Sequence, residues 1–201
     1  MKREFAVVVV ALAAVVPSRV AAQSGLAPSY SAPVRPFERS EIGVLITFPD
    51  PGGIGWEGTY RAVSGAFDVG IRGGIYDPGV GPSSTLARFE ARSQVVRHKG
   101  LHLFDAAVVF AASGEFRSGA TRFSVPIGFS VGRRIRGNRP LSLMPYIQPT
   151  ALLHGGQGMP TRLLVGIGVG ADLRLFNHVD LRLSSAVGQL HGASLGVVLL
   201  R

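Results

Sequence analysis

Apolar and small or polar side chains alternate along most of this chain, and this period of two constrains the fold more than any other feature. In the segment 121–134 the apolar positions begin at Phe123 and recur at every second residue up to Val131. Ser, Pro and Gly stand between them, and Arg122 and Arg134 flank them on the same face. Because successive side chains of a strand point to opposite faces, the segment predicts a strand with one apolar face and one small or polar face.

The same alternation recurs in the segments 162–175 and 178–184. A strand of a globular protein averages about five or six residues, whereas crossing a bilayer takes roughly 9–11 tilted residues. The second face of the segment 162–175 carries Gly, Asp172 and Arg174, where a water-facing sheet usually carries many Lys, Glu and Thr. These features predict an all-β fold, a transmembrane antiparallel up-and-down β-barrel with lipid outside and a crowded polar interior.

Clusters of Gly, Pro, Asn and Asp divide the chain into about ten such strands. An even number is typical of single-chain bacterial barrels and places both chain ends on the periplasmic side. Because Gly and Pro dilute the segment 41–62, a barrel of eight strands with an extra hairpin is the alternative. Loops near 114–118 and 154–161 are expected at the outer end, and basic turns near 96–101 and 134–140 at the periplasmic end. The expected strands are 41–48, 54–62, 66–76, 85–95, 102–113, 119–133, 141–153, 162–175, 178–187 and 191–200.

The first 22 residues have the pattern of a secretory signal peptide. Lys2 and Arg3 precede an apolar run, 5–16, and small residues follow at 20–22. The run is too short for a spanning helix, which needs about 20 residues, so a retained anchor is the weaker alternative. We expect residues 23–39, rich in Ser, Ala and Pro, to form a flexible periplasmic lead-in, and residues 40–201 to form the barrel. The expected destination is the cell outer membrane.

Composition limits the possible chemistry. The chain has no cysteine, which excludes disulfides, thiolate metal sites and cysteine nucleophiles. Its net charge of +9 comes almost entirely from Arg residues spread singly along the chain, which disfavours nucleic acid as a partner. His98 and His102 stand four residues apart in an expected turn beside Arg97 and Lys99, and neither this pair nor any carboxylate cluster suggests a metal site, so we expect no metal or other cofactor.

The second half of the chain resembles a known group of proteins. The residues concerned are the segments 125–128, 145–149, 166–174 and 178–182. Over roughly 120–185 they resemble small outer-membrane β-barrel proteins of the porin-like, OmpA/OmpW-like superfamily. The resemblance implies an eight- to ten-stranded barrel inserted by the barrel-assembly machinery, and it implies no active site. Such barrels commonly end in an aromatic residue, whereas this sequence ends in Arg201.

The inner faces of the expected strands carry charged residues, which form our candidate functional site. An unpaired buried charge is costly, so we expect the arginines and carboxylates to pair. Two outcomes are open: a salt-bridged plug, which a small barrel favours, or a narrow pore whose Arg excess prefers anions. The expected lumen-lining residues are Arg72, Arg88, Glu90, Arg92, Arg122, Asp172, Arg174, Asp180 and Arg182.

We therefore predict a structural or narrow-pore barrel that is not an enzyme, with outer-membrane lipids and the assembly machinery as partners. Two alternatives remain. His154 and His191, with Ser194 or Asp77 nearby, are candidates for a rim enzyme acting on lipid or peptide. A secreted soluble β-barrel or sandwich that binds an apolar ligand is the other alternative. The glycines at 166, 168 and 170 lie within a strand pattern, which disfavours a nucleotide-binding loop.

Overall fold

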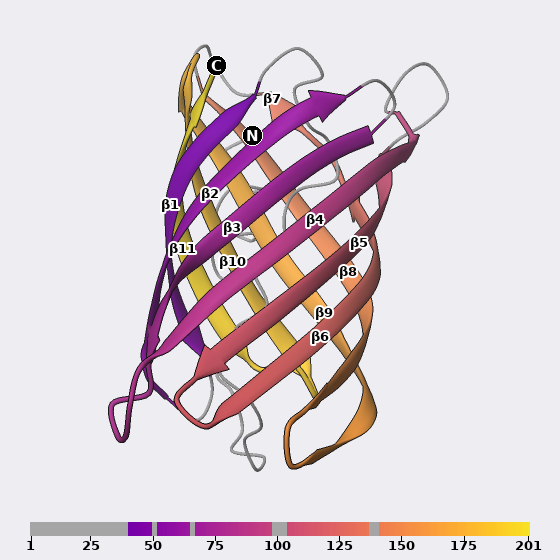
Figure 1. The fold of residues 1–201 in the computed structure, drawn as a ribbon. Helices are drawn as coiled ribbons and strands as arrows, with labels where there is room; N and C mark the ends of the chain where they lie inside the picture. Colours follow the sequence, from indigo (N-terminus) through magenta and orange to yellow (C-terminus); the bar gives the residue numbers. More distant parts are fainter. Residues whose placement is uncertain (1–39, 50–51, 65–66, 98–103, 137–140) are drawn as a thin grey trace.

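The computed structural model describes residues 40–49, 52–64, 67–97, 104–136 and 141–201. This part of the chain forms a closed antiparallel barrel of ten long, tilted strands and one two-residue strand (Figure 1). The expected signal peptide and lead-in, 1–22 and 23–39, lie outside the described residues. The strands are β1 (Glu41–Pro49), β2 (Ile54–Ser64), β3 (Phe67–Asp77), β4 (Ser84–Val96), β5 (Asp105–Arg117), β6 (Ala120–Gly132), β7 (Ile135–Arg136), β8 (Ser142–Gly156), β9 (Met159–Phe176), β10 (Val179–Gly188) and β11 (Gly192–Leu200).

The barrel closes between its first and last strands. β1 pairs with β11 from Glu41 opposite Leu200 to Pro49 opposite Gly192. The backbone N–H of Arg201 also donates to the carbonyl of Ser40 at 2.7 Å. Elsewhere each long strand pairs with the next long strand along the chain, and β6 pairs with β8 across the short β7. Closure therefore leaves none of the ten long strands as a free edge.

The ten-strand prediction is confirmed and the eight-strand alternative is excluded, because β1 and β2 are full members of the barrel despite their Gly and Pro content. Two of the expected loops, near 114–118 and 154–161, are wrong, because the strands extend through most of them and leave only tight turns. β5 and β6 continue until only Ser118 and Gly119 separate their ordered pairing, and β8 and β9 continue to a turn at Gln157 and Gly158. Gly119 and Gly158 have φ angles of 78° and 74°, which allow such tight turns.

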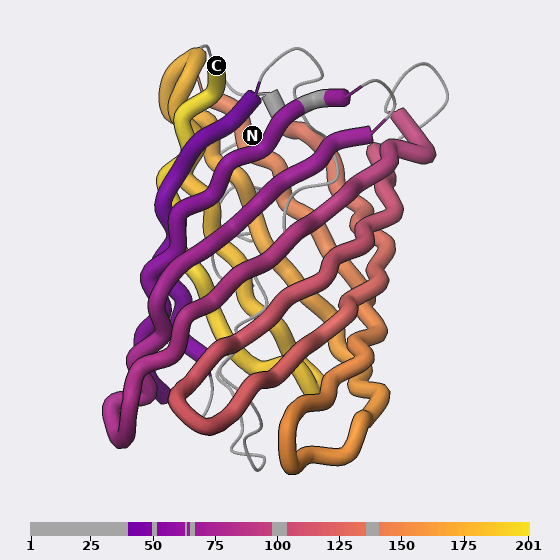
Figure 2. Tube along the Cα trace, in the orientation of Figure 1, coloured from indigo at the N-terminus to yellow at the C-terminus, as the bar shows by residue number. Residues whose placement is uncertain are grey.

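The connections gather at two ends of the barrel. At one end, called here the terminal end, lie the C-terminus and the β9–β10 turn (Figure 2). At the opposite end, called the hairpin end, lie the β3–β4, β5–β6 and β8–β9 connections (Figure 2). This grouping agrees with the predicted division of the turns into two sets.

Alternation along each strand separates two faces. In β3, Phe67, Ile71 and Ile75 are 56–59% exposed, whereas Asp68 and Arg72 between them are at most 8% exposed. Large apolar side chains therefore cover the outside of the barrel, and the buried side chains fill its inside. Because a strand has a period of two, this arrangement follows directly from the alternation in the sequence.

Candidate functional site

The nine predicted lumen residues all lie on the inner face of the barrel. Six are buried and three are partly exposed at the inner wall. The buried ones are Arg72, Glu90, Arg92, Asp172, Asp180 and Arg182, and the partly exposed ones are Arg88, Arg122 and Arg174.

Arg61 of β2 is the centre of the largest ion cluster in the described lumen. Its Nε donates to Glu41 Oε1 at 3.0 Å, its Nη1 to Asp68 Oδ1 at 2.8 Å and its Nη2 to Glu90 Oε1 at 2.5 Å. One guanidinium thus joins carboxylates from β1, β3 and β4. Arg92 donates to the second oxygen of Asp68 at 2.7 Å. The planar guanidinium suits this role, because its five N–H donors lie on three separate nitrogens that point to different strands.

Arg182 extends this cluster to the other side of the β1–β11 closure. It contacts Asp172 through Nε and Nη2 at 3.0 and 3.1 Å. It also contacts both carboxylate oxygens of Glu41 at 3.3 and 3.4 Å. Because Glu41 also accepts from Arg61, the ion cluster runs continuously from β4 to β9. We define the central ion cluster as Glu41, Arg61, Asp68, Arg88, Glu90, Arg92, Asp172 and Arg182.

Three further ion pairs flank the central cluster. Arg174 holds Asp180 in a two-point contact at 2.7 and 2.9 Å. Towards the hairpin end, Arg122 lies 3.6 Å from Glu115, whose other oxygen accepts from Ser84 at 2.8 Å. Arg72 lies 3.7 Å from Glu57. The predicted pairing of lumen arginines with carboxylates is thus present along the barrel.

Sequence reasoning missed several charged residues of the lumen. Glu57, Thr59 and Arg61 stand at every second position of β2 and so share one face. The alternation of this segment was therefore a signal that could have identified Glu57 and Arg61. Glu41 was harder to find, because β1 is apolar on both faces from Val44 to Ile46. The residues missed are Glu41, Glu57, Arg61, Asp68, Asp105, Glu115 and Arg134.

These additions change the charge of the lumen. The nine predicted residues contain six arginines and three carboxylates, which suggested an Arg excess. With these additions eight carboxylates face eight arginines, and Arg117, on the same face of β5 as Glu115, leaves only a small Arg excess. The arginines are 61, 72, 88, 92, 122, 134, 174 and 182, and the carboxylates are at 41, 57, 68, 90, 105, 115, 172 and 180.

The lumen is tightly filled around the charges. A cavity of about 10 Å³ lies among Arg61, Arg72, Arg88 and Glu90, which is room for about one water molecule. A buried apolar cluster occupies the neighbouring wall, including Tyr146, Leu152 and Leu164. The interior therefore combines ion pairs with ordinary apolar packing.

The two histidines considered for a rim enzyme lie in different settings. His154 is 2% exposed and faces Ser124 across the β6–β8 ladder. His191 is half-buried directly before β11, and nearby Ser194 is hydrogen-bonded to Ser184 at 2.7 Å. His98 and His102 lie outside the described residues. Among the residues described, no group of three or more His, Cys, Asp or Glu could hold a metal ion.

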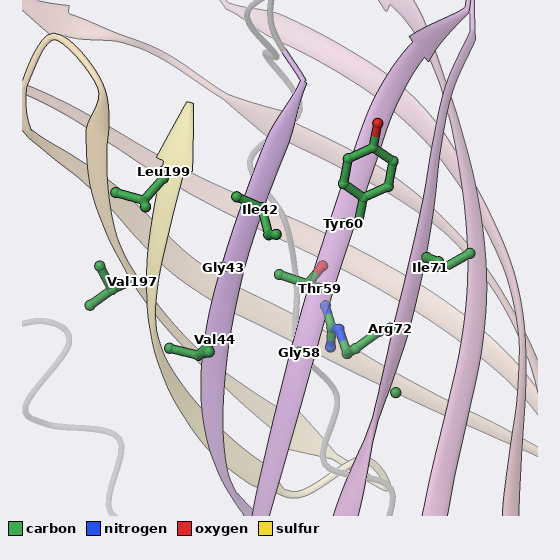
Figure 3. Close-up of a pocket in the computed structure, with 11 residues that line it drawn as sticks. Ile42, Gly43, Val44, Gly58, Thr59, Tyr60, Ile71, Arg72, Val197 and Leu199 are labelled. Atoms are coloured by element: carbon green, nitrogen blue, oxygen red, sulfur yellow. The ribbon is translucent and has the colours of Figure 1, made fainter. Parts of the chain in front are cut away.

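Two shallow apolar grooves mark the outer wall. The first, of about 760 Å³, lies over Gly58 of β2, and its lining includes Tyr60 of the same strand and Val44, Ile71 and Val197 of β1, β3 and β11 (Figure 3). It exists because Gly58 stands directly opposite Gly73, so two neighbouring outward positions lack side chains. The second, of about 770 Å³, lies over β6, β8 and β9.

No protein-family model and no curated protein matches this chain. One similar solved structure is a designed protein described as "De novo design of transmembrane beta-barrels". The two sequences are 10% identical, the match covers 87% of this chain and 100% of the other, and the TM-score is 0.40. Because so distant a likeness does not bear on function, the function is inferred from the barrel's own residues. Within the described ranges, no helix is long and apolar enough to cross a membrane.

Proposed function

We propose that this protein is a non-enzymatic β-barrel of the outer membrane whose lumen is closed by ion pairs. The observation that carries the proposal is the chemistry of the outer wall. At the described outward positions of the ten long strands, the one charged side chain is Asp77, the last residue of β3. The other charged side chains of these strands point into the barrel, some of them at the strand ends.

Such a surface suits lipid and not water. Soluble proteins rarely expose continuous apolar patches above a few hundred Å². Here large apolar side chains are exposed on every long strand, and examples from opposite sides of the barrel are Ile71, Phe110 and Leu163 at 59%, 50% and 66%. A band of this kind, uninterrupted by charge, is what a hydrocarbon environment stabilises.

Exposed aromatic side chains also occur near both ends of the band. Phe67, Phe104 and Phe176 lie at or beside strand ends at the terminal end. Phe48, Trp56, Phe116 and Phe123 lie near the hairpin end. Aromatic girdles at the two membrane interfaces are typical of outer-membrane barrels. This pattern supports a barrel that crosses the bilayer along its axis, with lipids and the barrel-assembly machinery as its partners.

The interior supports the plug over the narrow pore. Arg61, Arg92 and Arg182 are 4–5% exposed and ion-paired. An anion-selective pore needs an unpaired positive field along an open path. We therefore expect the barrel to have a structural role without steady conductance.

Two measurements test the proposal. We expect the protein to fractionate with the outer membrane and to migrate differently on electrophoresis before and after heating in detergent. Recovery in the soluble periplasmic fraction would rule out the membrane barrel. Purified protein in planar bilayers is expected to give a flat current trace, and stable anion-selective steps would replace the plug with a pore.

A further inference from the structure

The first outer groove has its floor where three paired strands lack large side chains at one level of the wall. Val44 of β1 stands opposite Gly58 of β2, which in turn stands opposite Gly73 of β3. All three positions are exposed on the outer wall, and the two glycines contribute no side chain. We call this floor, formed by Gly58 and Gly73, the hollow.

Large side chains bound the hollow on both sides. One outward position nearer the terminal end, Tyr60 and Ile71 pair with each other and are 44% and 59% exposed. One outward position nearer the hairpin end, Trp56 and Ile75 pair and are 60% and 59% exposed. The hollow is therefore a local depression between two ridges, which suits one elongated apolar group better than a flat partner surface.

The groove continues from the hollow towards the terminal end. Ile42 of β1 and Leu199 of β11 stand opposite each other and line this part (Figure 3). Alternation places Arg201 one outward position beyond Leu199, and its backbone N–H donates to the carbonyl of Ser40 at 2.7 Å. Ser40 precedes Val44 by four residues, which corresponds to about 13 Å of strand. This length is of the order of the hydrocarbon thickness of one leaflet, about 15 Å.

The exposed charges at the terminal end are positive. Arg97, Arg133 and Arg201 are exposed there. Within the described ranges the only exposed carboxylate is that of Asp77, which lies at the hairpin end, and the other carboxylates are buried in the lumen. An anion at the terminal rim therefore meets exposed cationic groups, and Arg201 is the one in line with the groove.

We propose that the first outer groove binds one anionic phospholipid of the leaflet at the terminal end. One acyl chain packs in the hollow, and the phosphate accepts hydrogen bonds from the Arg201 guanidinium, whose planar fork matches phosphate oxygens. The inference rests on the proposed function, because it requires the outer wall to face lipid. The binding is non-covalent and needs no cofactor.

The lining of the groove agrees with a lipid chain. Its exposed side chains are aliphatic except for Tyr60, whose hydroxyl points towards the terminal end (Figure 3). A hydrocarbon chain therefore fills the groove without covering a charged group, while a tyrosine hydroxyl near the membrane interface can remain in polar surroundings. The exposed arginine beyond the groove favours a chain that carries an anionic headgroup at that end.

Tryptophan quenching by phospholipids with brominated acyl chains tests the site. The one tryptophan of the chain, Trp56, lies beside the hollow and reports contact of the outer wall with lipid. Trp56→Phe/Tyr60→Trp moves the fluorophore to the wall of the groove and serves as the groove reporter. In phosphatidylcholine vesicles, we expect brominated phosphatidylglycerol to quench the groove reporter with about fivefold higher apparent affinity than brominated phosphatidylcholine, the effect of one Arg near anionic headgroups.

Two pairs of variants of the groove reporter locate the headgroup and the chain. Arg201→Gln is expected to remove the preference for phosphatidylglycerol, and Arg133→Gln, at the exposed end of β6, to preserve it. Gly58→Leu fills the hollow and should also remove the preference, whereas Ala151→Leu in the second groove should not. A Cβ on Gly58 meets no atom nearer than 3.9 Å, so folding is expected, and heat-modifiable migration checks it for each variant.

The outcomes separate this site from the membrane barrel. If no brominated lipid quenches wild-type Trp56, the membrane barrel itself is contradicted. Quenching of Trp56 with equal affinities of the two lipids for the groove reporter overturns the phospholipid site while the membrane barrel stands. A preference that survives Arg201→Gln, or that Arg133→Gln removes equally, overturns the role of Arg201. A preference that survives Gly58→Leu overturns the placement of the chain in the hollow.

Discussion

Arg61 joins three carboxylates that would otherwise repel one another in a confined interior. Glu41, Asp68 and Glu90 come from three different strands and meet on one guanidinium. Burying an ion pair often contributes little net stability, but removing one partner leaves an uncompensated buried charge. Single residues of the central ion cluster therefore matter chiefly through the charges that they neutralise.

We predict that Arg61→Met destabilises the folded barrel by about 3–5 kcal/mol, because three buried carboxylates lose their shared donor. Urea unfolding in lipid vesicles, followed by heat-modifiable migration, measures the change. Arg162→Met is the matched control, since Arg162 is exposed near the β8–β9 turn. An effect of Arg61→Met no larger than that of the control would contradict the central role of this residue.

The isolated pair of Arg174 and Asp180 allows a cleaner measurement of coupling. Arg174→Met alone leaves the buried carboxylate of Asp180 without this ion-pair partner, whereas Arg174→Met/Asp180→Leu removes both charges. We expect the double variant to lose less stability than the sum of the two single variants, with a coupling of about 1–3 kcal/mol. Additive effects in the same unfolding assay would show that the two-point contact contributes nothing.

At the scale of the strand, glycine has different roles on the two faces of the same hairpin. A Cβ on Gly74 would lie 2.0 Å from the carbonyl oxygen of Trp56. A Cβ on Gly58 would meet nothing nearer than the Gly73 oxygen at 3.9 Å. Gly74 therefore permits the close β2–β3 pairing, whereas Gly58 leaves a gap in the outer wall.

This contrast gives a matched pair of variants. We predict that Gly74→Ala costs about 1–3 kcal/mol, because the backbone of β2 must move away. Gly58→Ala should be neutral or stabilising by up to about 1 kcal/mol, since it restricts the unfolded chain without a clash. Urea midpoints of the two variants check the order, and the reverse order would refute the assigned roles.

At the scale of the whole molecule, the barrel separates two environments across a single layer of backbone. Ion pairs fill one side and apolar side chains cover the other. The separation is maintained on all ten long strands, so a charge placed at the middle of the outer wall should be far more costly than one placed at its edge.

We predict that Ile71→Arg, in the middle of β3, destabilises the barrel in lipid by about 2–4 kcal/mol, against about 0–1 kcal/mol for Phe67→Arg at the strand end. Both positions are outward and similarly exposed, at 59% and 56%. Folding into vesicles of defined thickness measures the difference. Equal and small effects would mean that the outer wall does not face hydrocarbon.

The alternation, together with the turn residues between its segments, predicted about ten strands, with eight as the alternative, and the face of each predicted lumen residue. It succeeded because a period of two is a local property that each strand carries in its own residues, as β6 does from Phe123 to Val131. Turn lengths were predicted less well, since the hairpins at Gly119 and Gly158 depend on how far pairing continues between two strands.

The sequence by itself thus determined the alternating faces and the inward position of the predicted charges, whereas the pairing of β1 and β2 in the closed barrel decided for ten strands over eight. Only the tertiary structure decided which charges meet. Glu41 and Arg182 are far apart in the sequence, and closure of β1 on β11 brings them into contact. Pairing of β2 with β1 and with β3 places Glu41 and Asp68 around Arg61. The pairing of charges depends on register around a closed ring, and no single strand contains that information.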